Sequence, residues 1–160
     1  MPLLRPLHDR DVEQVLALNH RNVEALAPMD ADRLRLLTRW ADRFDVLEED
    51  GAFAGFVITF AAGSAYDSEN YRWFTERHAH GFYYLDRIVL HEDFRRRGLG
   101  GFVYDELEDV ARRHGRLALE VNLVPRNDAS LAFHAARGYR EVGRLGDDQH
   151  LVLLMEKALS

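Results

Sequence analysis

The chain has 160 residues, of which 47% are hydrophobic and 30% are charged, and its formal net charge is −6. These values are typical of a single globular domain spanning residues 1–160, and the acidic balance argues against a nucleic-acid partner. No cysteine is present, which excludes disulfides and thiol catalysis. The longest apolar run, from Ala52 to Ala62, is 11 residues long and too short to span a bilayer. Residues 1–9 lack the apolar core of a signal peptide, so we expect a cytoplasmic protein with no membrane partner.

The first part of the chain predicts a strand, two helices and a hairpin. Apolar residues recur every three or four positions after Asp11 and again after Asp30, and aspartate is a favoured residue at the start of a helix. The pair Asp50–Gly51 lies between two apolar runs, which is typical of a tight hairpin turn. We therefore expect a strand at residues 3–5, helices ending near residues 20 and 40, and paired strands at residues 44–48 and 52–60.

A long connection follows at residues 61–81. Connections of this length in a compact domain are usually functional or contain a short helix of their own. Its aromatic residues alternate with Asp and Asn, which suits the wall of a pocket, although the aromatic side chains could equally anchor the segment to the core. His78 and His80 have no further ligands nearby in the sequence, so we expect no metal site. The weak candidates for contact with a substrate, here and on neighbouring predicted elements, are Asn19, Tyr66, Tyr71, Trp73, Tyr83 and Tyr84.

The centre of the chain predicts an anion site. A β-prone segment at residues 82–90 is followed by a basic, glycine-containing turn at residues 95–101 and by a helix at residues 99–114. The first amides of a helix have no partner within the helix, and the helix dipole places partial positive charge there. A pyrophosphate is the expected guest; the alternative is a solvated basic turn. On the helix, Glu108 and Arg112 are spaced for an i,i+4 ion pair.

The last part of the chain predicts a strand, a helix and two final strands. Residues 116–123 alternate, and Glu120 lies in the middle of this apolar segment, where a carboxylate needs a partner or a function. Asn127 or Asp128 can begin a helix that ends at Gly138. Strands are expected at residues 139–143 and 151–155.

Two motifs, one in the centre of the chain and one in its last part, resemble those of the GNAT superfamily of N-acetyltransferases. The first is Arg95-x-x-Gly98-x-Gly100, which follows a strand and opens a helix, as in the family's acetyl-CoA signature. The second begins at Asn127 and ends at Gly138–Tyr139, which fills the family's Gly-Phe position. His134 occupies the position that usually holds a tyrosine acid. The resemblance is specific over residues 82–145, whereas residues 1–60 agree only in the order of elements.

The resemblance implies an α/β (α+β) fold, with a mixed, mostly antiparallel central sheet flanked by helices. Acetyl-CoA would lie in the cleft between the central strand and its successor, and no metal is expected. The implied cofactor contacts are Ile88, Val89, Leu90, Arg95, Arg96, Arg97, Gly98, Leu99, Gly100, Gly101, Asn127, Ser130, Phe133 and His134.

Three residues are candidates for catalysis. Asp86 or Glu120 would accept the proton of the acceptor amine, unless each is instead a buried ion-pair partner, for example of Arg87. His134 would hydrogen bond to the leaving sulfur, unless it merely covers the cofactor.

The implied activity is acetyl transfer to a primary amine of a small molecule or peptide. The rivals are a non-catalytic acyl-CoA sensing module and an enzyme that uses another acyl chain or an oxygen acceptor. A dinucleotide-binding module is disfavoured, because the glycine spacing differs from Gly-x-Gly-x-x-Gly. Dimers are common in the family, so a homodimer stays open.

Overall fold

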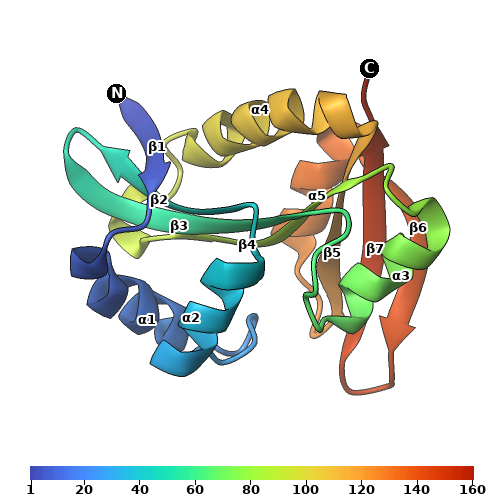
Figure 1. Ribbon diagram of the computed structural model, residues 1–160, viewed down its shortest axis with the longest axis horizontal. Helices are drawn as coiled ribbons and strands as arrows, with labels where there is room; N and C mark the ends of the chain where they lie inside the picture. Colours follow the sequence, from blue (N-terminus) through green and yellow to red (C-terminus); the bar gives the residue numbers. More distant parts are fainter.

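One mixed sheet of seven strands organises the computed structural model, which describes all 160 residues (Figure 1). The strands follow the order β1-β2-β3-β4-β5-β7-β6. Only β4 and β5 pair in parallel; every other neighbouring pair is antiparallel. The predicted fold class is therefore confirmed. The strands are β1 (Pro2–Pro6), β2 (Arg43–Glu49), β3 (Ala52–Ala61), β4 (Tyr83–Leu90), β5 (Arg116–Val124), β6 (Arg140–Gly146) and β7 (Leu151–Ala158).

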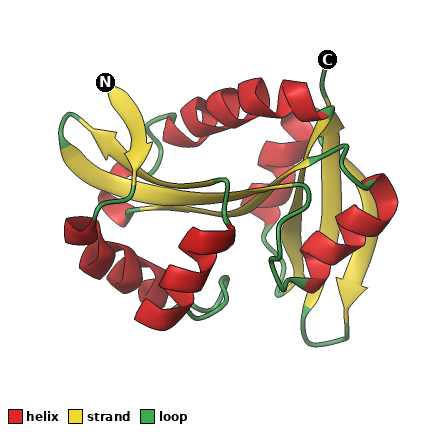
Figure 2. Cartoon of the chain, viewed as in Figure 1, coloured by secondary structure: helices red, strands yellow, loops and turns green.

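Five α-helices cover the two faces of this sheet (Figure 2). They are α1 (Val12–Arg21), α2 (Ala31–Trp40), α3 (Glu69–His78), α4 (Leu99–Ala111) and α5 (Asp128–Ala136). Helices α1, α2 and α3 pack on one face around a core of 17 buried residues, and α4 packs on the other around a core of 16. None of these helices combines the length and the apolar character needed to cross a membrane.

The predicted helix starts are found where the sequence placed them. The Asp30 side chain accepts a hydrogen bond from the amide of Arg33 (2.8 Å), and Asn127 Oδ1 accepts one from the amide of Ser130 (3.1 Å). The long connection at residues 61–81 contains α3, whose first turn is capped by Ser68. These caps satisfy amides that otherwise lack partners, so each helix begins at a defined residue.

The predicted pair between Glu108 and Arg112 is wrong. Glu108 is buried beneath α4, where it accepts hydrogen bonds from Lys157 (2.9 Å), Arg137 (3.2 Å) and Tyr139 (2.8 Å). The i,i+4 spacing shows only that two side chains lie on neighbouring parts of a helix surface. Here the Glu108 side chain points toward the protein interior, where other cations bind it. Glu108 therefore ties α4 to the end of α5 and to β7.

The sheet opens between β4 and β5. These strands pair only at Tyr83 with Leu117 and at Tyr84 with Ala118, so residues 85–90 of β4 have no strand partner on that side. Figure 1 shows the strands β1 to β4 diverging from the group formed by β5, β7 and β6. The divergence exposes a strand edge and creates room in the middle of the molecule.

A β-bulge interrupts β4 beside this opening. Thr59 of β3 pairs with Leu85 and Ile58 pairs with Arg87, which leaves Asp86 without a partner on β3. A bulge breaks the alternation of side chains along a strand. As a result, Asp86 and Arg87 lie on the same face of the sheet, the one covered by α1 and α2.

Candidate active site

A cavity of about 450 Å³ lies where β4 and β5 diverge. Its floor comes from residues 85–88 of β4 and 119–122 of β5, and residues 25–27 between α1 and α2 close one side. Residues 66–70 form another wall, and α4 and α5 contribute Tyr104, Asn127, Ser130 and His134. The cavity therefore reaches both faces of the sheet, and it joins the predicted cofactor side to the predicted acceptor side.

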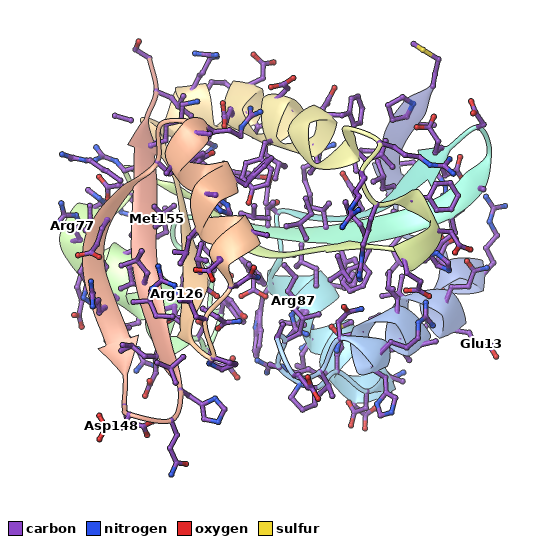
Figure 3. The ribbon with its side chains drawn as sticks, turned by 180° about the vertical axis from the view of Figure 1, so that it is seen from behind. Glu13, Arg77, Arg87, Arg126, Asp148 and Met155 are labelled. Atoms are coloured by element: carbon purple, nitrogen blue, oxygen red, sulfur yellow. The ribbon has the colours of Figure 1, made fainter.

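Asp86 and Arg87 form a fixed ion pair at the floor of the cavity. Arg87 Nε donates to Asp86 Oδ2 (3.2 Å), and the Tyr66 hydroxyl donates to Asp86 Oδ1 (2.7 Å). Arg87 Nη1 also donates to Asn19 Oδ1 (2.9 Å) and to the carbonyl of Ala27 (2.8 Å). Figure 3 shows Arg87 between the sheet and the helices α1 and α2. Burial raises the pKa of Asp86, although the adjacent Arg87 opposes this rise.

Glu120 faces the same cavity from β5, and no cation pairs with it. Its carboxylate accepts a hydrogen bond from the Tyr84 hydroxyl. Burial and the nearby charge of Asp86 raise the pKa of Glu120 to about 8, while hydrogen bonds from Tyr84 and Asn70 act in the opposite direction. Burial also raises the pKa of the Tyr66 and Tyr84 hydroxyls, which therefore stay protonated and serve as donors. Glu120 is thus poised to exchange a proton near neutral pH.

His134 lies on the α5 side of the cavity in a defined tautomer. Its Nδ1 is 2.7 Å from the carbonyl of Ser130, so Nδ1 carries the proton and Nε2 is an acceptor. The Tyr104 hydroxyl lies 2.6 Å from Nε2 and donates to it. Burial lowers the pKa of His134, which keeps the ring neutral. Both ring nitrogens of His134 are thus engaged within the protein, and the nearest hydroxyl on this side of the cavity is that of Tyr104.

The turn at residues 95–101 is built as an open anion cradle. Gly98 has a left-handed backbone (φ +75°), Arg96 shares this conformation (φ +63°), and no side chain caps the first amides of α4. An added Cβ at Gly98 would meet nothing within 4 Å. The side chains of Arg95, Arg96 and Arg97 are exposed around this turn. The residues of this turn fit a pyrophosphate. The unpaired edge of β4 fits an extended pantetheine chain.

The other predicted cofactor residues lie along the same route. Ile88, Asn127, Ser130 and His134 line the cavity, and the Phe133 ring lies 3.9 Å from the position of a Cβ on Gly100. Gly101 lies beside Arg137, whereas Leu99 and Val89 are buried in the two cores. Leu90 continues the open edge of β4. For Leu99 and Val89, a cofactor contact is limited to the main chain.

The predicted substrate residues divide into two groups. Tyr66 lines the cavity, while Tyr84 and Asn19 lie one layer behind it, holding Glu120 and Arg87. The other three residues lie elsewhere, because the core or a neighbouring strand takes up their side chains. The Tyr71 hydroxyl donates to Ala61, Trp73 packs against Gly143 of β6, and Tyr83 hydrogen bonds to Thr59 and Asp42 on the opposite face.

Several polar residues of the cavity were not candidates in the sequence analysis, among them Tyr104, Arg33, Asp67 and Asn70. Tyr104 follows Val103 on the buried face of α4, so its position resembled that of an ordinary core residue. Arg33 and Asp67 form a bidentate ion pair across one wall (2.7 and 2.9 Å), and Asn70 contributes to another. Arg33 and Asp67 lie 34 positions apart in the sequence, so no local pattern connects them.

The sequence model of the acetyltransferase (GNAT) family matches residues 10–139. The chain belongs to this family. The match covers both motifs and every residue that lines the cavity except Val152. Enzymes of the GNAT family generally use acetyl-CoA, and the open strand edge and uncapped α4 described above fit that group.

One sequence relative and two solved structures illustrate the similarity of this GNAT chain to known proteins. An uncharacterized N-acetyltransferase encoded in the pepI 3′ region of Lactobacillus delbrueckii subsp. lactis is 30% identical over 79 residues. That match covers 47% of this chain and 46% of the relative, about half of each. Ard1 from Thermoplasma volcanium is 18% identical, with 99% and 98% of the two chains covered and a TM-score of 0.76. A ribosomal-protein-alanine N-acetyltransferase from Brucella melitensis is 25% identical, with 98% and 99% covered and a TM-score of 0.69.

Proposed function

We propose that this chain transfers the acetyl group of acetyl-CoA directly to a primary amine of a small molecule or peptide. The observation that carries the proposal is the state of Glu120. Three carboxyl groups line the cavity, and two of them are paired with arginines, Asp67 with Arg33 and Asp86 with Arg87. Glu120 alone has no cation. An acceptor amine, which is an ammonium ion at neutral pH, supplies the missing charge.

Glu120 is the proton acceptor in this proposal. An ammonium ion must lose a proton before its nitrogen can attack a carbonyl carbon, and Glu120 Oε receives that proton. Tyr84 and Asn70 orient the carboxylate, and Asp86 raises its pKa toward the working pH. Acetyl-CoA supplies the acetyl group as a thioester, whose carbon–sulfur bond breaks as the new carbon–nitrogen bond forms.

Tyr104 is the proton donor for the departing thiolate. Its hydroxyl lies in the cavity, and at rest its hydrogen bond to His134 Nε2 holds the phenol oxygen in place. As the carbon–sulfur bond breaks, the O–H turns from Nε2 to the sulfur and gives it the proton, and the phenolate then regains a proton from solvent. His134 is in turn held by the Ser130 carbonyl. His134 therefore acts as a positioning residue for Tyr104, in place of the tyrosine that the family usually carries at position 134.

The cofactor site rests on separate residues. The amides of residues 98–101 and the three arginines bind the pyrophosphate, and the open edge of β4 pairs with pantetheine. Asn127 Oδ1 is used as a helix cap, which leaves its amide NH₂ free to donate toward the pantetheine arm.

Thiol release in the presence of acetyl-CoA and a panel of amines tests this function. Calorimetry with acetyl-CoA and CoA, with NAD as the control, establishes the cofactor site independently. Binding of acetyl-CoA without turnover of any amine or alcohol would leave only the sensing module. Turnover with alcohols alone would instead assign an oxygen acceptor.

A further inference from the structure

The ionisable side chains of the cavity wall bear on which kind of amine can bind there. Its walls contain three carboxyl groups, on Asp67, Asp86 and Glu120, and two guanidinium groups, on Arg33 and Arg87. The remaining ionisable groups of the wall, on Tyr66, Tyr104 and His134, are neutral because burial raises the pKa of the two phenols and lowers that of the imidazole. The electrostatic environment of an entering acceptor is therefore decided by the other five side chains, of which Glu120 is ionised only in part at neutral pH.

Both arginines are already occupied by side chains of the protein. Arg33 presents two nitrogens to the two oxygens of Asp67, at 2.7 and 2.9 Å. Arg87 is bound to Asp86, Asn19 and the Ala27 carbonyl, and its side chain is only 4% exposed. A bidentate arginine–carboxylate pair leaves the guanidinium poorly available to a second carboxylate.

We propose that the acceptor is an amine with no carboxylate beside it: a simple amine, or the amino terminus of a peptide, whose adjacent carbonyl is a neutral amide. The inference rests on the proposed function and names its substrate class. A free α-amino acid would bring its own carboxylate next to Glu120 and Asp86, with no free cation to receive it. The loss of water from that unpaired carboxylate, together with repulsion from the ionised fraction of Glu120, then weakens its binding.

Matched triplets of acceptors test this selectivity. Each triplet holds a simple amine, the corresponding α-amino acid and its carboxamide: 2-phenylethylamine with phenylalanine and phenylalaninamide, and isoamylamine with leucine and leucinamide. In each triplet that reacts, we expect kcat/KM for the simple amine and the carboxamide to exceed that for the amino acid at least tenfold. The amino acid is less basic than the simple amine, so basicity alone would favour the amino acid over the simple amine. The carboxamide is the least basic of the three, so the comparison of amino acid with simple amine decides the test.

The outcomes separate the inference from the function beneath it. An amino acid that reacts as well as the corresponding simple amine would overturn the inference and leave amine acetylation standing. If protein that binds acetyl-CoA by calorimetry releases no thiol with any member of either triplet, the proposed function and the inference both fall. Binding of the same amines to the CoA-loaded protein, measured by calorimetry, gives the preference without reference to turnover.

A variant that frees one arginine provides a second test. Asp67→Asn removes the partner of Arg33, and we expect the ratio of kcat/KM for amino acid over simple amine to rise about tenfold. Asp32→Asn is the matched control, because Asp32 pairs with Arg35 on the exposed side of α2, outside the cavity. A ratio that does not change in Asp67→Asn, or that changes equally in Asp32→Asn, would refute the part assigned to the Arg33–Asp67 pair.

Discussion

Replacement of Glu120 by glutamine tests the proton acceptor most directly. The amide keeps the shape of the side chain and a hydrogen bond with Tyr84, but it cannot take up a proton. A positioned general base contributes roughly 10²- to 10⁴-fold, so kcat should fall by at least about 100-fold. Since the pKa of Glu120 is about 8, about one-tenth of the wild-type protein is ionised at pH 7 and about half at pH 8. The contribution of Glu120 ionisation to the kcat/KM of the wild type should therefore rise about fivefold over that interval and be nearly complete above about pH 9.

Asp86→Asn is the companion variant, because the charge of Asp86 helps to raise the pKa of Glu120. Its removal should move the rising limb of the pH profile to lower pH while most of kcat is retained. The acceptor's own ionisation also changes the rate with pH, but it is the same for every variant, so a shift between variants reports on the protein. If Glu120→Gln kept the wild-type kcat and profile, Glu120 would not be the base, and the reasoning from its unpaired charge would be wrong.

Three further predictions concern the sulfur side, the cofactor and the scaffold. Tyr104→Phe should lower kcat roughly 100-fold, the usual effect of losing a general acid, with the calorimetric Kd for acetyl-CoA unchanged; a full kcat would remove Tyr104 as donor. Asn127→Ala should raise the KM for acetyl-CoA and cost about 1 kcal/mol of stability through the lost cap, whereas Asp30→Ala should show only the loss of stability; equal KM values would contradict a pantetheine contact. Glu156→Gln should destabilise the fold by about 3 kcal/mol in denaturant titrations, because the buried carboxylate binds His78 and Arg116. Burial raises the pKa of Glu156, but its cationic partners bring it below 4.5 overall, so this difference should be present above pH 4.5 and should shrink as the pH falls through the folded-state pKa; a constant difference would contradict the linkage.

Local patterns in the sequence were sufficient for most of the fold. Helix caps at Asp30 and Asn127, the hairpin turn at Asp50–Gly51 and the alternation of β5 depend on neighbours in the chain, and each was predicted correctly. The alternation also placed Glu120 on one face of β5 with Ala118. Contacts between distant elements were not predictable in this way. Trp73 packs against Gly143 and Glu108 binds Lys157, and neither pairing has a local signature.

The bulge in β4 is the feature that the sequence conceals and that matters most for the site. Regular alternation would place Asp86 and Arg87 on opposite faces of the sheet, and no glycine or proline marks a departure from it. Because Asp86 is unpaired with β3, both side chains instead face α1 and α2, where they bind each other beside Glu120. Arg87 thus gives Asp86 a permanent partner, and Asp86 raises the pKa of a glutamate that has none. One extra residue in β4 thereby gives Asp86 a cation and leaves Glu120 without one, which is why we propose Glu120 rather than Asp86 as the base.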